Sequence, residues 1–88
     1  MSEQIEIVHN PKNQCFSAQV DGYQAILEYR TVDAQTLDFH HTYVPNELRG
    51  KGIAALLAKA GLAFAKQQGY TVIPSCSYIE VYLQRHPQ

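Results

Sequence analysis

The feature that most constrains the fold is one long amphipathic segment set between two short segments of strand character. Between residues 52 and 68, apolar side chains recur every three or four positions, as on one face of an α-helix. These side chains are Ile53, Leu56, Leu57, Ala60 and Phe64. Gly69 is well placed to end the helix. Residues 37–44 and 70–74 flank the helix as strands, and this order predicts a crossover between two parallel strands of one sheet.

The residues before the crossover predict an antiparallel meander. Three strands are expected at 5–8, 15–20 and 23–30, with 37–44 as the fourth. Asp21-Gly22 is typical of a two-residue type I′ turn, in which both residues adopt positive φ. A polar loop through Asp33 and Gln35 would lead into the fourth strand, and a short last helix is expected over 78–85.

The expected element order is therefore β-β-β-β-α-β-α, an α+β fold with a mixed five-stranded sheet. A chain of 88 residues has room for one domain, so residues 1–88 are expected to form a single unit.

Alternation along residues 37–44 assigns their side chains to the two faces of the sheet. One face would carry Leu37, Phe39, His41 and Tyr43, and the other Asp38, His40, Thr42 and Val44. Pro45 has no amide hydrogen and ends strand pairing. The two parallel strands are therefore expected to diverge near Tyr43 and Pro74, which would open a cleft between them.

Composition excludes several classes of protein. Hydrophobic residues make up 45% of the chain, charged residues 17%, and the net charge is −1, all values of an ordinary folded domain rather than a disordered chain. No apolar run approaches the roughly 20 residues of a membrane span, and the first residues lack a signal-peptide pattern. Cys15 and Cys76 are too few for a disulfide framework or a zinc site. We therefore expect a cytoplasmic protein with no metal, no membrane contact and no nucleic-acid partner.

Positive charge gathers in the half of the chain that holds a glycine-rich segment. Residues 1–45 contain two Lys or Arg against six Asp or Glu, whereas residues 46–88 contain five against two. Such a distribution favours an anionic ligand of modest size.

The segment Arg-Gly-Lys-Gly-Ile-Ala at 49–54 opens the long helix. The first turn of a helix leaves amide groups unpaired, and the helix dipole adds positive potential there. Gly50 and Gly52 leave room for a phosphate to approach these amides, and Arg49 and Lys51 add charge-assisted hydrogen bonds. The spacing of the glycines differs from both the Walker A loop and the dinucleotide fingerprint. The segment predicts a pyrophosphate site, and the alternative is a glycine-rich helix start with two solvated cations.

The pattern Arg49-x-x-Gly52-x-Ala54, after a strand ending Tyr43-Val44-Pro45, resembles motif A of the GCN5-related N-acetyltransferase (GNAT) superfamily. Three segments, 41–45, 49–54 and 74–78, are similar in particular to a small YidJ-like subgroup, as is the ending at 85–87. The resemblance implies a minimal acyl-CoA N-acyltransferase fold with acetyl-coenzyme A as cosubstrate. Its binding residues would be Tyr43, Val44, Arg49, Gly50, Lys51, Gly52, Ile53 and Ala54.

The resemblance also implies roles for three side chains. Cys76, just past the last strand, would accept the acetyl group or act as a base, unless it is a small buried thiol. His41 would be a general base, with a half-buried sheet residue as the alternative, and His40 would lie on the other face. Tyr78 would protonate the departing thiolate or else pack against the sheet. Cys15 is interpreted as a packing residue.

The resemblance therefore implies transfer of an acetyl group from acetyl-coenzyme A to a primary amine, either directly or through acetyl-Cys76. The acceptor, a small molecule or a protein, does not follow from the resemblance. Residues 10–14 form only a turn where the superfamily has a helical region that shapes the acceptor side. The alternative function is a non-catalytic acyl-CoA binding or sensing module.

Overall fold

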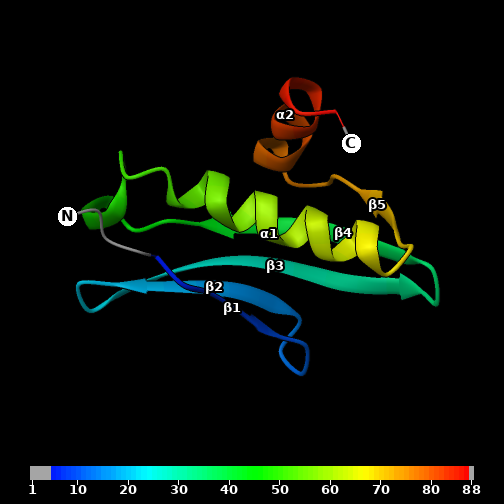
Figure 1. Cartoon of the computed structure of the whole chain (residues 1–88), viewed down its shortest axis with the longest axis horizontal. Helices are drawn as coiled ribbons and strands as arrows, with labels where there is room; N and C mark the ends of the chain where they lie inside the picture. The colour runs from blue at the N-terminus through cyan, green and yellow to red at the C-terminus, as the bar shows by residue number, and fades with distance from the viewer. Residues whose placement is uncertain (1–4, 88) are drawn as a thin grey trace.

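The computed structural model describes residues 5–87, which form a five-stranded sheet with two α-helices and one short 3-10 helix (Figure 1). The elements are β1 (Ile7–Asn10), β2 (Cys15–Val20), β3 (Tyr23–Asp33), β4 (Thr36–Tyr43), η1 (Asn46–Leu48), α1 (Ile53–Gln67), β5 (Thr71–Ile73) and α2 (Ser77–Arg85). Residues 1–4 and 88 of the expected domain lie outside the described residues. The strands lie in sequence order, antiparallel except for the parallel pair β4–β5, so the expected mixed α+β sheet is confirmed.

The two hairpins around β3 differ in how well the sequence predicts them. Asp21 and Gly22 both have positive φ, 54° and 82°, which confirms the type I′ turn between β2 and β3. The expected polar loop after residue 30 is wrong, because β3 continues to Asp33 and β4 begins at Thr36. The Asp33 carboxylate accepts a hydrogen bond of 2.8 Å from the Gln35 amide and closes this tight turn.

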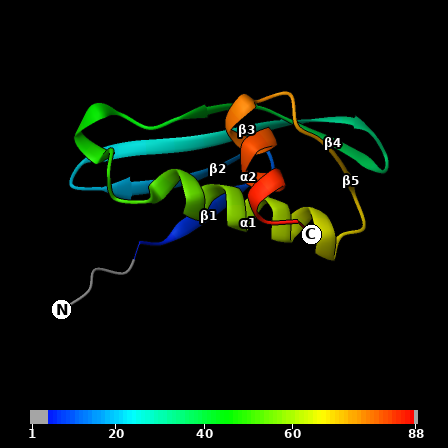
Figure 2. The same cartoon turned by 90° about the horizontal axis from the view of Figure 1, so that it is seen from above.

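The hydrophobic core lies between α1 and one face of the sheet (Figure 2). It contains Phe16, Ala18, Val20, Ala25, Leu27, Tyr29, Leu37, Phe39, Leu48, Ile53, Leu57, Ala58, Leu62, Ala65 and Ile79. Within the described residues no helix packs on the opposite face, and its side chains at Val8 and Tyr43 are half exposed. Helix α2 starts at the β5 edge and crosses toward α1, where Ile79 joins the core.

A bulge in β4 changes which side chains face the helix. Tyr29 of β3 pairs with Phe39, but its neighbour Glu28 pairs with His41, so His40 is an extra residue without a partner in the pairing. Beyond the bulge, Thr42 lies opposite the buried Leu27 and therefore shares its helix-covered face. The expected alternation is thus wrong past residue 39, because Thr42 and Val44 face the helix side and His41 and Tyr43 the open side.

The parallel strands part at Pro74 as expected, but earlier along β4 than expected. Pairing joins Thr36–Asp38 to Thr71–Ile73 and stops there, so the divergence begins at Phe39 rather than near Tyr43. Beyond the Phe39 carbonyl, which accepts a hydrogen bond from the Cys76 amide, residues 40–43 form a free edge of the sheet, and the chain leaves β5 to form α2.

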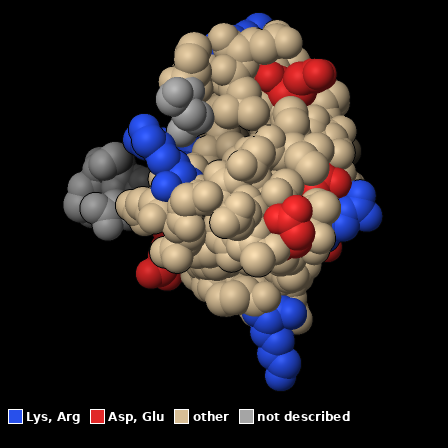
Figure 3. Space-filling model, turned by 90° about the vertical axis from the view of Figure 1, so that its right-hand side faces the viewer, with Lys and Arg blue, Asp and Glu red and all other residues tan. Residues whose placement is uncertain are grey.

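The surface carries charges of both signs. On the end of the molecule that holds the β3–β4 turn, most of the surface is neither acidic nor basic, and separate acidic and basic groups are scattered over it (Figure 3). No described helix has the length and apolarity to cross a membrane. Among residues 5–87 no cluster of three or more histidine, cysteine or carboxylate side chains is positioned to hold a metal ion.

Candidate active site

The glycine-rich segment forms the N-terminal entry to α1, as the sequence predicts. Gly50 and Gly52 have positive φ, 83° and 73°, a conformation that a side chain disfavours. Gly52 is the N-cap residue of α1, and no side chain caps the helix there. The first amides of α1 therefore lack a side-chain acceptor and face outward at the positive end of the helix dipole.

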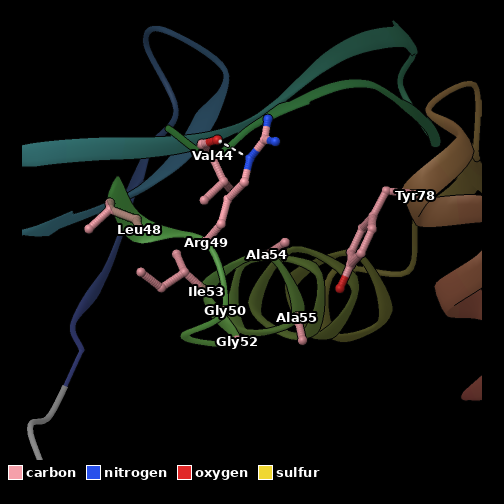
Figure 4. Close-up of a pocket in the computed structure, with 9 residues that line it drawn as sticks. All are labelled: Val44, Leu48, Arg49, Gly50, Gly52, Ile53, Ala54, Ala55 and Tyr78. Carbon is pink, nitrogen blue, oxygen red and sulfur yellow. Dashed lines mark hydrogen bonds between the residues drawn. The ribbon is translucent and has the colours of Figure 1, made fainter. Parts of the chain in front are cut away.

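A pocket of about 310 Å³ lies between the end of β4, the start of α1 and the start of α2 (Figure 4). We call it the cofactor pocket, after the cosubstrate that the sequence leads us to expect. It is lined by Val44, Leu48, Arg49, Gly50, Gly52, Ile53, Ala54, Ala55 and Tyr78. Six of the eight residues expected to bind the cosubstrate are among these. Tyr43 and Lys51 are not: Tyr43 pairs with Ile26 and points to the open face, and Lys51 is exposed. Leu48 and Ala55 complete the lining, and the sequence does not predict them.

Arg49 reaches across this pocket to the strand. Its Nε donates a hydrogen bond of 3.3 Å to the Val44 carbonyl, and Figure 4 shows the side chain spanning from the loop to the end of β4. Val44 lies beyond the last residue that pairs with β5. Arg49 therefore supplies a partner to a main-chain acceptor that the parting of the strands exposes.

Cys76 is held against β4 by main-chain and side-chain bonds. Its amide donates to the Phe39 carbonyl at 2.9 Å, immediately past the last β4–β5 pair. Its Sγ lies 3.3 Å from Thr42 Oγ1, within hydrogen-bonding distance. Cys76 is also the N-cap residue of α2. The thiol is half-buried at the point where the strands part, although it does not line the cofactor pocket.

The Arg30–Asp38 pair supports this turn from the other side. The Asp38 carboxylate is buried and accepts two hydrogen bonds from Arg30, at 3.0 and 3.2 Å. The neighbouring Ser75 holds the pKa of Asp38 below its ordinary value, burial opposes this shift, and Arg30 adds to it. Both bonds from Arg30 go to Oδ2, and Oδ1 is buried without a hydrogen-bond partner among the described residues.

His41 and Cys76 lie on different faces of β4. His41 pairs with Glu28, whose face α1 does not cover, and its side chain is exposed. The bulge also brings His40 to this face, so the expectation that the two histidines occupy opposite faces is wrong. The structure does not bring the His41 imidazole and the Cys76 thiol together.

Tyr78 projects from the first turn of α2 into the cofactor pocket. Figure 4 shows its hydroxyl directed toward α1 near Ala54 and Ala55. Burial raises the pKa of Tyr78 above its ordinary value, the nearby Tyr82 adds to the rise, and Arg85 opposes it. The phenol is therefore protonated at neutral pH and available as a proton donor.

Sequence reasoning misses Thr42, Asp38 and Ser75 as neighbours of Cys76. It places Thr42 on the Asp38 face of β4, away from the core, because strict alternation does not anticipate a bulge. No local sequence pattern predicts the bulge, because the bulge depends on how β4 pairs with β3. Asp38 carries a signal, because a carboxylate in the middle of a buried strand requires a partner.

Comparison with known proteins identifies the family. A profile of the family described as GCN5-related N-acetyl-transferase matches residues 15–88. The chain belongs to this family. It is 36% identical over 88 residues to protein NATD1 of Xenopus tropicalis, an alignment that covers 98% of this chain and 81% of the relative. It is 34% identical over 85 residues to protein NATD1 of Homo sapiens, with 94% of this chain and 75% of the relative covered.

Family membership, the mixed sheet and the glycine-rich entry to α1 agree with one another. The cofactor pocket lies at the position where motif A opens the helix, and the residues that carry the resemblance line it. The chain is therefore a GNAT domain with the minimal fold of that superfamily.

Proposed function

We propose that the domain binds acetyl-coenzyme A, with the pyrophosphate at the amides of residues 50–54 and the pantetheine arm along the free edge of β4. The observation that carries this proposal is the cofactor pocket, because it joins an uncapped helix N-terminus to an unpaired strand end. The helix N-terminus offers amide donors to the pyrophosphate, and the strand end offers main-chain groups to the amides of the pantetheine arm. The three segments 41–45, 49–54 and 74–78 support a place in the small YidJ-like subgroup.

We propose further that the domain transfers the acetyl group to a primary amine. The amine nitrogen attacks the thioester carbonyl, the C–S bond breaks, and the coenzyme A thiolate takes the Tyr78 hydroxyl proton. The amine gives up its proton to water or to His41. Because His41 lies on the open face, it serves as the base only for an amine that approaches across the free edge of β4 from that face.

A covalent route uses Cys76 on the opposite face. Its thiolate attacks the thioester carbonyl and forms acetyl-Cys76, coenzyme A leaves, and the amine then attacks the new thioester and regenerates the thiolate. Two contacts support this role. Cys76 Sγ lies 3.3 Å from the Thr42 hydroxyl, and Cys76 begins α2, whose N-terminus favours negative charge.

One observation favours a second function, an acyl-CoA binding or sensing module without catalysis. Only four residues, 11–14, join β1 to β2, so the described chain has no helical region there to form an acceptor site. In this alternative the cofactor pocket is used in the same way, but no acetyl group leaves it.

Intact-mass spectrometry separates these functions. The protein is incubated with acetyl-coenzyme A, with and without a panel of primary amines that includes polyamines and peptides. Acetylated amine without a protein adduct supports direct transfer, and an acetyl adduct that is lost in Cys76→Ala supports the covalent route. Binding of coenzyme A with neither product supports the sensing module. Absence of binding refutes the proposal.

A further inference from the structure

Helix α2 presents a stripe of aromatic and basic side chains. The proposed reaction uses Tyr78 alone among them, and the core only partly buries Tyr82. Tyr78, Tyr82 and Arg85 are spaced i, i+4 and i+7, so they lie along one side of the helix. Ile79, on another side, is buried in the core. Glu80, the one acidic residue of α2, falls about half a turn away from the stripe and is exposed.

This stripe and α1 enclose a second pocket, which we name the aromatic groove. It is lined by Ala55, Tyr78, Val81, Tyr82, Arg85 and His86. The groove shares Ala55 and Tyr78 with the cofactor pocket, so the two are neighbours separated by the Tyr78 ring. Its volume of about 220 Å³ is below the range of roughly 300–1,000 Å³ typical of whole-ligand sites. The groove therefore suits one part of a ligand whose remainder occupies the cofactor pocket.

The wall of the groove is a ladder of rings. The Tyr78 and Tyr82 ring centroids are 6.4 Å apart with an interplanar angle of 33°, and those of Tyr82 and His86 are 4.3 Å apart and stacked at 23°. His86 Nδ1 lies 3.2 Å from the Tyr82 carbonyl, which ties the end of the ladder to the helix. On the α1 side the lining residue is Ala55, whose small side chain leaves space against these rings. Such a wall suits a flat aromatic ring.

The charges around the groove select the kind of ligand. Arg85 lines it, and its charge acts on Tyr78, opposing the rise that burial causes in the pKa of that phenol. Lys59 is exposed and lies one turn beyond Ala55 on the same side of α1. Two cations repel a protonated amine acceptor and attract phosphate.

We propose that the aromatic groove binds the adenosine 3′-phosphate end of coenzyme A, with the adenine against the tyrosine rings and the 3′-phosphate at Arg85. This inference rests on the proposed function, since it requires the pyrophosphate of the same ligand at the start of α1. It assigns α2 a binding role: Tyr78 separates the nucleotide from the thioester end, and Tyr82 and Arg85 hold the nucleotide.

The test compares coenzyme A, 3′-dephospho-coenzyme A and phosphopantetheine, which lacks the adenosine 3′-phosphate together with one phosphate of the pyrophosphate, so the change that each variant causes is compared between ligands. Calorimetry measures their affinities for the wild type, Tyr82→Ala and Arg85→Gln. Tyr82→Ala is expected to weaken coenzyme A about tenfold, the scale of one lost base–aromatic stack, and to leave phosphopantetheine unchanged. Arg85→Gln is expected to remove the preference for coenzyme A over its dephospho form.

Matched variants guard against a structural effect. Tyr82 is partly buried against the core, so Tyr82→Phe, which keeps the ring, should keep the affinity for coenzyme A, and Glu80→Gln on the outer side of α2 should do the same. The inference is overturned if the wild type binds coenzyme A and phosphopantetheine equally well, or if Tyr82→Ala weakens both by the same factor. A wild type that binds none of the three ligands refutes the proposed function instead.

Discussion

Two glycines at opposite ends of α1 provide a matched test of the pyrophosphate site. Gly52 and Gly69 have nearly equal φ angles, 73° and 77°, and an added Cβ would meet no protein atom within 4 Å at either position. Only Gly52 lines the cofactor pocket. Alanine at each position should therefore cost the same folding stability, but only Gly52→Ala should impair ligand binding.

The magnitudes come from backbone strain and from lost hydrogen bonds. The left-handed conformation costs an alanine about 1–2 kcal/mol, and the stiffer unfolded chain returns about 0.5–1 kcal/mol. Each variant should thus lose about 1 kcal/mol, which lowers Tm by roughly 4–8 °C in a domain of this size. A methyl group that keeps the phosphate from one amide removes a hydrogen bond to a charged group, worth about 1.5–3 kcal/mol. Gly52→Ala should therefore weaken coenzyme A binding about tenfold to a hundredfold.

Thermal melts and calorimetry with coenzyme A measure both effects on the same two proteins. Equal melting temperatures with unequal affinities support the site at the start of α1. If Gly52→Ala and Gly69→Ala bind coenzyme A with equal affinity, the phosphate does not approach Gly52 and the reasoning fails.

Three further outcomes are expected. Gly61→Ala should destabilise the domain by about 1–2 kcal/mol, as measured by urea unfolding, and a more stable variant would contradict this. The added Cβ would lie 2.9–3.0 Å from two fully buried core side chains, and this overpacking outweighs the gain in helix propensity. Burial lowers the pKa of His9, so the stability that neutral His9 contributes is complete above pH 6.5 and is lost as the pH falls through the lower pKa of the folded state. His9→Gln should therefore lose less Tm between pH 7 and pH 5 than the wild type. Parallel curves of Tm against pH for the two proteins would disprove this linkage. Acetyl-coenzyme A should protect Cys76 from alkylation, which mass spectrometry would detect, and an unprotected Cys76 would remove this residue from the site. Burial and Glu28 raise the pKa of Cys15, so Cys15 should react slowly with or without the ligand.

The order of the elements could be predicted because each one is encoded locally. The apolar spacing in α1, the Asp21-Gly22 turn and the glycines at both ends of α1 have the structure that their sequence indicates. The start of the cofactor pocket could be predicted for the same reason, since Gly50 and Gly52 determine the conformation of their own segment.

The faces of β4 could not be predicted because they depend on a partner strand. His40 becomes an extra residue only through the pairing of β4 with β3. Strand β3 is 11 residues long and has an irregularity of its own at Val32. Cys15, interpreted as a packing residue, pairs with Glu28 on the face that α1 leaves open, where alternation with the buried Phe16 places it. The burial of Asp38 likewise depends on Arg30 and Ser75 from other strands and loops.

The extra residue at His40 divides β4 into two halves of opposite parity. In the first half, odd-numbered residues such as Leu37 and Phe39 build the core, and in the second half the even-numbered Thr42 and Val44 turn toward the cleft. Removing His40 would leave a regular ladder in which Thr42 still lies opposite Leu27, so this strand position should tolerate the loss of one residue. If β4 instead kept all its residues and paired without the bulge, His41 would lie opposite Leu27 and Thr42 would turn away from the thiol of Cys76. The contact between Thr42 and Cys76 therefore depends on one residue being left out of the pairing, even though His40 itself is exposed and does not line the cofactor pocket.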